Sequence, residues 1–175
     1  MSDAALRSLE HDALFGALYP QLRRIAHGQL RRNQPITLLD TTGLVHEAWL
    51  RVAEGQGLPT GDRGHFLGCA ARVMRFIVID FVRQRHAQRR GGDAVHVTLD
   101  TGIGDTATLH DEQLLRLNDA LEELAQVDDR LVKVIEMRCF AGLSEIQIGE
   151  ALGVTVRTVR RQWQRARLLL HAALA

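Results

Sequence analysis

The stretch SEIQIGEALGVTVRTV, residues 144–159, carries the strongest local fold signal in the sequence. Ser144 followed three residues later by Gln147 is a capping box, which predicts the start of a helix. Gly149 supplies a small residue where two helices would cross, and Gly153 supplies a glycine for the sharp turn between them. The apolar residues of a miniature core are Ile148, Leu152, Val154 and Val159. This pattern is typical of a helix-turn-helix.

The sequence predicts a further helix from Thr155 to about Leu174, with Thr155 as its N-cap. Apolar residues recur in it at steps of three and four and would face inward. These residues are Val156, Val159, Trp163, Ala166 and Leu170. The helix contains no acidic residue, and its other side carries Arg157, Arg160, Arg161, Gln164 and Arg165.

Arginine forks suit phosphates and guanine edges, and glutamine suits adenine, so this side is predicted to enter the DNA major groove. The alternative is a solvated cationic helix end, because cations near a helix C-terminus are favoured by the macrodipole. Most of these arginines lie in the N-terminal half of the helix, where that explanation has the wrong sign.

Apolar periodicity predicts three helices in the first half of the chain. The first spans about residues 4–32, and Pro20 either kinks it or begins a second helix. Another helix follows a loop at 33–42, and a long one covers about 64–90 after a Gly- and Pro-containing loop at 55–64.

The long helix carries Arg72, Arg75, Phe76 and Arg83 along one stripe. Cations mixed with apolar side chains suit clamping of a nucleic-acid backbone together with stacking against unpaired bases. The alternative is that Phe76 packs against the first helices of the same domain.

Residues 91–111 are rich in Gly, Thr and Asp without a sustained period, which predicts a flexible acidic linker. A chain of 175 residues with 46% hydrophobic content can bury one moderate core or two small ones. We therefore expect an all-α fold of two small helical domains, 1–90 and 112–175, the second a helix-turn-helix domain.

The charges are sorted along the chain. Residues 1–92 contain 13 basic and 8 acidic residues, 93–129 contain 1 and 10, and 130–175 contain 8 and 3. Two basic blocks separated by an acidic one indicate two modules that bind polyanions, with a segment between them that could shield them.

The sequence gives no sign of catalytic or metal chemistry. Cys69 and Cys139 are far apart and lack the spacing of a zinc site or a disulfide framework. His46-Glu47 lacks the second histidine of a metalloprotease helix. Nowhere do 18 consecutive apolar residues occur. We expect a cytoplasmic protein that is not an enzyme and has no cofactor, metal or membrane partner.

Two parts of the sequence resemble one family. His65-Phe66-Leu67 onward to the arginine cluster at 83–90 resembles the second conserved region of bacterial sigma factors. Phe140-Ala141-Gly142-Leu143-Ser144 through Val159-Arg160 and Arg165-Ala166-Arg167 resembles their fourth region. The order of the two regions and the linker between them are similar to the extracytoplasmic-function (ECF) type, over nearly the whole chain.

The resemblance implies a subunit that binds core RNA polymerase and directs promoter recognition, DNA opening and transcription initiation. The residues implied at the minus-thirty-five element are Thr155, Arg157, Arg160, Arg161, Gln164 and Arg165. The residues implied at the minus-ten element and its melting are Arg72, Arg75, Phe76 and Arg83, with the loop at 55–64 holding a flipped base. The residues implied in polymerase binding are Asp40, Leu44, Val45, His46, Glu47, Trp49 and Leu50.

The sequence departs from the family before the Leu44-Val45 pair. Members usually have an acidic cluster there, whereas this chain keeps Asp40 and continues Thr41-Thr42-Gly43. Resemblance to the subgroup with Thr-rich sequence at this place implies activation by a Ser/Thr protein kinase. A phosphate would restore about −1.5 to −2 charges, with Thr42 the preferred acceptor and Thr41 the second. The alternative is simple helix N-capping by these threonines.

Two further interpretations stay open. An anti-sigma factor is a second kind of regulatory partner that the resemblance allows. A different class of protein is a stand-alone helix-turn-helix regulator that binds operator DNA without polymerase. Such a regulator would need a dimer interface, and the first half of the chain shows no sustained heptad seam.

Overall fold

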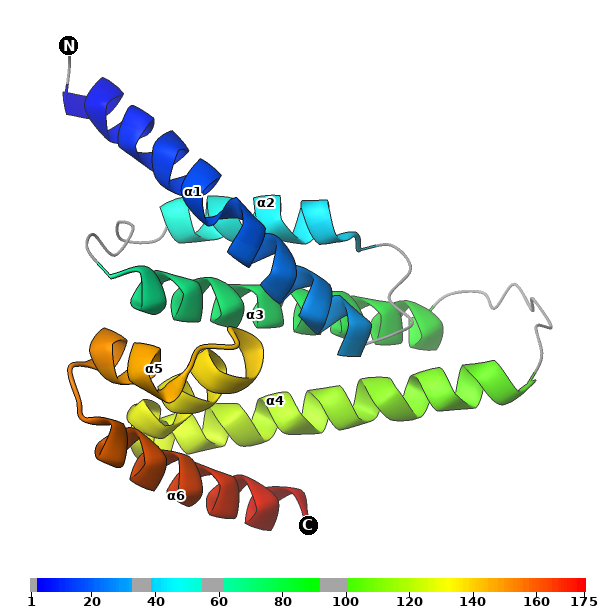
Figure 1. Cartoon of the computed structure of the whole chain (residues 1–175). Coiled ribbons are helices and arrows are strands. Elements are labelled where there is room, and N and C mark those ends of the chain that lie inside the picture. The colour runs from blue at the N-terminus through cyan, green and yellow to red at the C-terminus, as the bar shows by residue number, and fades with distance from the viewer. Residues whose placement is uncertain (1–2, 33–38, 55–61, 92–100) are drawn as a thin grey trace.

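The computed structural model describes residues 3–32, 39–54, 62–91 and 101–175 (Figure 1). Its elements are α1 (Asp3–Arg32), α2 (Thr41–Glu54), α3 (Arg63–Gly91), α4 (Thr101–Ile135), the π-helical turn η1 (Glu136–Phe140), α5 (Glu145–Leu152) and α6 (Val156–Leu174). Every element in these ranges is helical, which confirms the all-α expectation for the described part of the chain.

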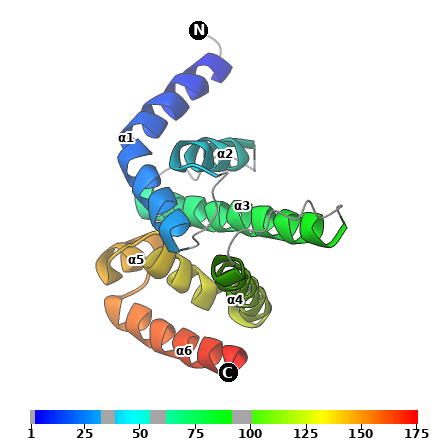
Figure 2. The same ribbon diagram turned by 90° about the vertical axis from the view of Figure 1, so that its right-hand side faces the viewer.

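The first three helices pack against one another around a common core. α1 continues through Pro20 as one helix, so the proline does not begin a second one. The helix bends near its middle in Figure 2, as a residue without an amide hydrogen requires inside a helix. The residues that α1, α2 and α3 bury most completely include Leu18, Leu22, Ala26, Leu44, Val45, Phe66, Met74 and Val78.

α4 lies beside α3 on one side and α6 on the other (Figure 2). Its helical path is interrupted at Asp128, whose φ of −158° and ψ of 94° are extended values. The Asp128 Oδ1 atom accepts a hydrogen bond of 3.1 Å from the Arg130 N–H, so this side chain caps the segment that follows. α4 therefore consists of two helical segments that meet at Asp128.

The beginning of α4 corrects the expectation of a flexible linker over residues 91–111. Residues 101–111 are helical, whereas 92–100 lie outside the described residues. Gly102 and Gly104 disfavour a helix, but Asp111 is 3% exposed and bonds to Arg85 and His86 at the end of α3. This tertiary contact outweighs the local preference of the sequence.

The turn between α5 and α6 has the local geometry that the sequence predicts. Both hydrogen bonds of the Ser144 capping box are present, and Gly153 ends α5 with a φ of +65°, in the left-handed region that favours glycine. Thr155 caps α6, with its hydroxyl oxygen accepting from the Thr158 N–H at 3.3 Å. A side chain on Gly149 would begin 2.8 Å from the Val154 carbonyl oxygen. The crossing therefore needs a glycine.

The two halves of the chain share one apolar core. Leu143, Ile148 and Val159 belong to the same cluster as the core residues of α1, α2 and α3. A second cluster fills the space between α4 and α6 and contains Leu121, Leu124, Leu131, Val132, Ile135 and Ala166. The helices of the C-terminal half are therefore packed onto the N-terminal half, and the division into two domains stays a prediction.

We expect Gly149→Ala to lower the free energy of unfolding by about 1–3 kcal/mol, because the methyl group has no room beside the Val154 carbonyl. Gly16→Ala in α1 is the matched control, since nothing lies within 4 Å of its added methyl group. That change should raise the free energy of unfolding by about 0.5–1 kcal/mol. Urea titrations followed by circular dichroism measure both, and equal effects would contradict the close crossing.

Candidate nucleic-acid interface

One side of α6 is a continuous exposed polar surface, called here the α6 polar face. It consists of Thr155, Arg157, Arg160, Arg161, Gln164 and Arg165, all of which are exposed. On the opposite side Val159 and Ala166 are fully buried. Trp163 lies at the edge, with the Arg138 guanidinium 4.6 Å from its ring centroid. The helix therefore has the two faces that its periodicity predicts.

Within the α6 polar face, one arginine is held by an acid and the others are not. The Arg160 Nε atom is 2.7 Å from Glu145 Oε2, and Glu145 also accepts a 3.0 Å hydrogen bond from Arg138. The hydrogen bond from Arg160, helped by that from Arg138, lowers the pKa of Glu145 below its ordinary value. Arg157, Arg161 and Arg165 form no ion pair with any residue in the described ranges.

Arg130 adds a cation to this surface that the sequence reasoning missed. It borders a hollow of about 260 Å³ together with Arg161 and Arg165. Arg130 follows the Asp128 cap on a different helical segment, so the periodicity of α6 could not include it. The one sequence signal for Arg130 was the position of a basic residue directly after the break in the helix.

The second set of predicted residues lies on α3 and is called here the α3 stripe: Arg72, Arg75, Phe76 and Arg83. The structure brings them together, but against α4 and η1. Arg75 is only 3% exposed, bonds to Glu136 Oε1 at 2.8 Å and donates to the Asn118 side chain. Arg72 lies 3.4 Å from Asp129, and Arg83 lies 3.4 Å from Asp119. These three arginines therefore already have intramolecular acidic partners.

Phe76 and Glu136 complete the surroundings of Arg75. Its guanidinium lies 4.6 Å from the Phe76 ring centroid, a cation–π distance. Burial raises the pKa of Glu136, and the hydrogen bond from Arg75 acts against that rise. Ile79, three residues after Phe76 in α3, is 1% exposed. This side of α3 is thus packed around Arg75 and Ile79, whereas Arg83 stays exposed.

The residues predicted on α2 divide into a buried and an exposed group. Leu44 and Val45 are fully buried in the core, and Trp49 is half-buried with its ring centroid 4.7 Å from that of Phe15. The exposed members are Asp40, His46, Glu47 and Leu50. Of these seven predicted residues, four are therefore exposed on α2 or directly before it, and the other three pack toward the core.

Asp40 caps α2, which corrects the alternative that the threonines do so. The Asp40 Oδ1 atom accepts a 2.5 Å hydrogen bond from the Gly43 N–H. A methyl group on Gly43 would lie 2.8 Å from the same oxygen, so the glycine leaves room for this cap. Thr42 is exposed in a first turn that contains no acidic residue.

The loop predicted to hold a flipped base falls at 55–64, and its residues 55–61 lie outside the described residues. Its last part forms the start of α3. Asp62 Oδ1 accepts a 2.7 Å hydrogen bond from the Gly64 N–H and caps the helix.

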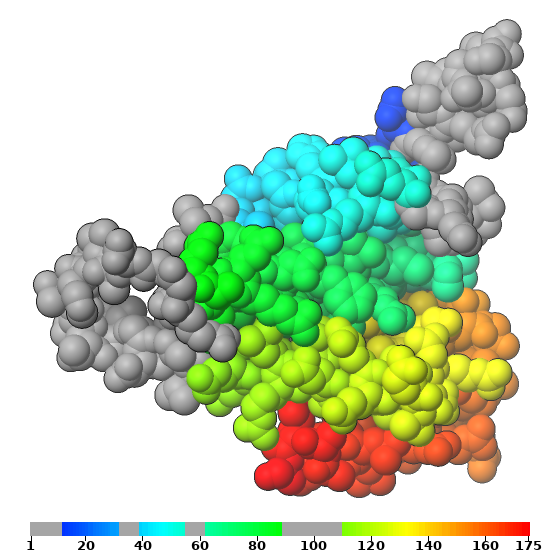
Figure 3. Space-filling model, turned by 180° about the vertical axis from the view of Figure 1, so that it is seen from behind, coloured from blue at the N-terminus to red at the C-terminus, as the bar shows by residue number. Residues whose placement is uncertain are grey.

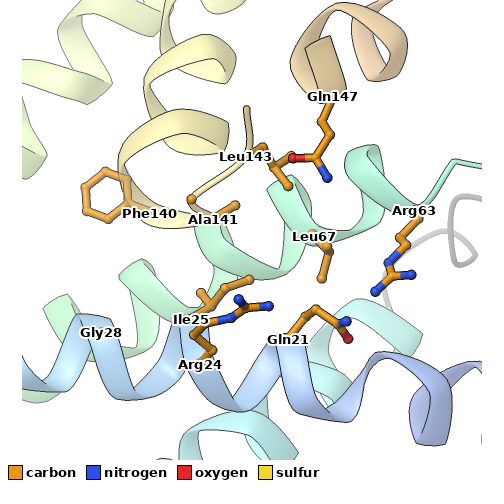
Figure 4. Close-up of a pocket in the computed structure, with 11 residues that line it drawn as sticks. Gln21, Arg24, Ile25, Gly28, Arg63, Leu67, Phe140, Ala141, Leu143 and Gln147 are labelled. Carbon is orange, nitrogen blue, oxygen red and sulfur yellow. The ribbon is translucent and has the colours of Figure 1, made fainter. Parts of the chain in front are cut away.

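A cavity of about 530 Å³ lies between α1, the start of α3 and the turn that joins η1 to α5 (Figure 4). Its polar side chains include Arg24, Arg63 and Gln147, and its lining contains no acid, histidine or cysteine. The cavity thus offers no proton-transfer or thiol group, and it marks where the two halves of the chain meet.

Within the described ranges, no helix is long and apolar enough to cross a bilayer. The same residues include no group of three or more His, Cys, Asp or Glu side chains placed to hold a metal ion.

Two basic helices, one exposed and one paired with acids, agree with the protein family that the sequence matches. The model of the ECF sigma factor family matches residues 8–175. The chain belongs to the ECF sigma factor family. Comparisons with curated proteins and with solved structures give no match. This sigma factor has a role in transcription initiation, and its family partners are core RNA polymerase and promoter DNA. ECF sigma factors are regulators of transcription rather than enzymes.

Because the pKa of Glu145 is lowered in the folded chain, the free energy of unfolding should depend on pH through this residue. A carboxylate whose pKa is lower in the folded state stabilises the fold above its unfolded-state pKa, and this contribution is lost as the pH falls through the folded-state value. Wild type should therefore be more stable than Glu145→Gln at pH 7, and the difference should shrink from about pH 5 toward about pH 2. Urea titrations across this range measure it. Glu150→Gln, which removes an exposed acid from the same helix, is the control with the same charge change.

Proposed function

We propose that this sigma factor docks on core polymerase through α2, reads the minus-thirty-five element through the α6 polar face and supports the opened minus-ten strand through the α3 stripe. The observation that carries the proposal is the α6 polar face, whose six side chains are all exposed on a helix without acids. A helix entering a major groove needs such a face.

The free arginines of this face are suited to contacts with DNA. Arg157, Arg161 and Arg165 have no acidic partner among the described residues, so their guanidinium groups need not break an ion pair first. Arg161 and Arg165 share their hollow with Arg130 and with Asp128, whose Oδ1 already accepts from the Arg130 N–H. Three cations against one carboxylate still favour a phosphate of the DNA backbone. We therefore add Arg130 as a backbone contact.

The α2 surface is suited to a protein partner. Leu50 is an apolar side chain that is 55% exposed, flanked on the exposed side of α2 by His46 and Glu47. An exposed large apolar side chain with a charged and a polar neighbour resembles the anchor and rim of a docking surface. Leu44 and Val45 support this surface from below.

Phosphorylation at Thr42 would add negative charge to the first turn of α2, which contains no acidic residue. The helix begins with Asp40 as its cap and no acid in its first turn, and the helix N-terminus favours anions. A phosphate there would supply about −1.5 to −2 charges beside the docking surface. We propose that a Ser/Thr kinase activates polymerase binding through Thr42, with Thr41 as the second candidate.

The DNA contacts are tested by transcription with bacterial core RNA polymerase on a promoter library, with start sites mapped by sequencing. Arg161→Ala should weaken promoter use by roughly five- to 150-fold, the loss of about 1–3 kcal/mol for one specific arginine contact. Arg23→Ala removes an exposed cation from α1 and is the charge-matched control, for which we expect no comparable loss.

Defined start sites that appear only with the chain present would support the sigma factor proposal. Specific duplex binding that needs no polymerase and yields no transcripts would instead support a stand-alone regulator. Equal losses for Arg161→Ala and Arg23→Ala would count against a specific role of the α6 polar face.

The kinase proposal is tested with Thr42→Glu and its uncharged match Thr42→Gln. We expect Thr42→Glu to bind core polymerase more tightly than wild type, by about 0.2–1 kcal/mol, because it places a negative charge beside the docking surface, where it can pair with a cation of the partner. Thr42→Gln should bind as wild type does. Fluorescence anisotropy of the labelled chain titrated with core polymerase measures both, and equal affinities of the two variants would contradict the proposal.

A further inference from the structure

We propose that the cavity between α1, the start of α3 and the turn from η1 to α5 is a binding site for a small organic anion, namely a phosphate monoester with an apolar body. Its volume of about 530 Å³ is in the range of small-molecule pockets in proteins. The site goes beyond the proposed function and does not rest on it.

Two arginines supply the positive charge of the cavity. Arg24 comes from α1 and Arg63 from the first position of α3, and in Figure 4 both guanidinium groups face the same space. Neither arginine forms an ion pair with a residue in the described ranges. Two cations that share a cavity repel each other, and an anion bound between them would remove that repulsion.

The surroundings of these arginines leave their charge available. Among the described residues, no acidic side chain lines the cavity. Asp62 directly precedes Arg63, but its Oδ1 atom accepts a 2.7 Å hydrogen bond from the Gly64 N–H and caps α3. The Gln21 amide donates to the Leu18 carbonyl at 3.1 Å and accepts from the Arg63 guanidinium. A neutral amide thus holds Arg63 without neutralising it.

The donors of the cavity suit a phosphate better than a single carboxylate. A phosphate monoester carries about −1.5 to −2 charges at pH 7 and three acceptor oxygens. It can accept from two guanidinium groups at once, whereas one carboxylate balances only one of them. Gln147 of α5 adds an amide that points into the cavity in Figure 4. Arg63 also begins a helix, and a helix N-terminus favours an anion.

The remainder of the lining is apolar. Ile25, Leu67 and Leu143 are buried core residues whose side chains border the cavity. In Figure 4 Leu67 lies among the polar ends of Arg24, Arg63 and Gln147. Contact with these side chains would take an apolar body out of water, so the site should prefer an ester to inorganic phosphate.

The cavity lies apart from the ion pairs between α3 and α4. Its α3 residues are Arg63 and Leu67, whereas the first of these ion pairs is at Arg72. Figure 3 shows α3 and α4 side by side on the back of the molecule, and the cavity is lined by α1 and α5 instead. Substitutions in the cavity therefore leave these pairs in place.

Titration of the full-length, isotope-labelled chain with phenyl phosphate tests the site. Backbone amide NMR signals of Gly28, Gly142 and Gln147 report binding at the cavity. We expect saturable shifts of these signals. Inorganic phosphate and phenol each carry one half of the chemistry of the probe, and both should bind at least about tenfold more weakly.

Single charge changes test the two arginines. Arg24→Gln and Arg63→Gln should each weaken phenyl phosphate binding by at least about tenfold, because each removes a charged hydrogen-bond donor. Arg23→Gln removes an exposed cation next to Arg24 in the chain and is the control with the same charge change. It should bind the probe as wild type does.

A substitution at Gly28 tests whether the anion lies inside the cavity. Gly28 lines the cavity, and an added methyl group there would meet no atom within 4 Å, so a larger side chain has room to enter. Gly28→Leu should abolish saturable binding although both arginines remain. Gly16→Leu, at another open glycine of α1, is the control. If circular dichroism shows that Gly28→Leu does not fold, the arginine variants carry the test.

The site would be refuted if phenyl phosphate gave no saturable shift of these amides by about 10 mM. Equal losses for Arg23→Gln and Arg63→Gln would also count against it, as would undiminished binding to a folded Gly28→Leu chain. Shifts of the same amides by a single-stranded oligodeoxynucleotide but not by phenyl phosphate would assign these arginines to a nucleic-acid backbone and overturn the small-molecule site. Transcription is not read in this test, so its outcome is independent of the proposed function.

Discussion

The Arg75 guanidinium must have partners wherever it lies, and in this structure it is removed from water between α3 and the C-terminal half of the chain. Burial of a guanidinium is tolerated when a carboxylate and a further acceptor receive its hydrogens, and here these are Glu136 and Asn118. Asn118 lies in α4 and Glu136 opens η1, so one side chain fixes both elements against α3. The remaining contacts between the halves are arranged around it.

The interface around Arg75 has two parts with different physics. At the η1–α5 end it is apolar, with Met137, Leu143 and Ile148 joining the core of the first three helices. Along α4 it combines apolar contacts from Leu114, Leu115 and Val134 with ion pairs, two of which, at Arg72 and Arg83, reach the surface. The apolar end favours association at any ionic strength, whereas the ionic part sets the register and responds to salt and to competing anions.

Features set by neighbouring residues could be predicted from the sequence, and those set by distant ones could not. The Ser144 capping box, the turn at Gly153 and the two faces of α6 depend on residues a few positions apart. The burial of Arg75 depends on Glu136, 61 positions away, which no local pattern reveals. The helix over 101–111 was missed for the same reason. The capping of α2 by Asp40 was missed because a shift of one residue in the helix start changes which side chain caps it.

The α6 polar face is exposed in the same structure in which carboxylates of α4 and η1 hold the arginines of the α3 stripe, with Arg75 buried. Under the proposed function, this asymmetry imposes an order of events. A chain in this arrangement can survey duplex DNA with α6, whereas the arginines of the α3 stripe must leave their carboxylates before they can retain a separated strand. Search and strand capture then become successive steps, and a free chain could sample many duplex sites without melting any of them.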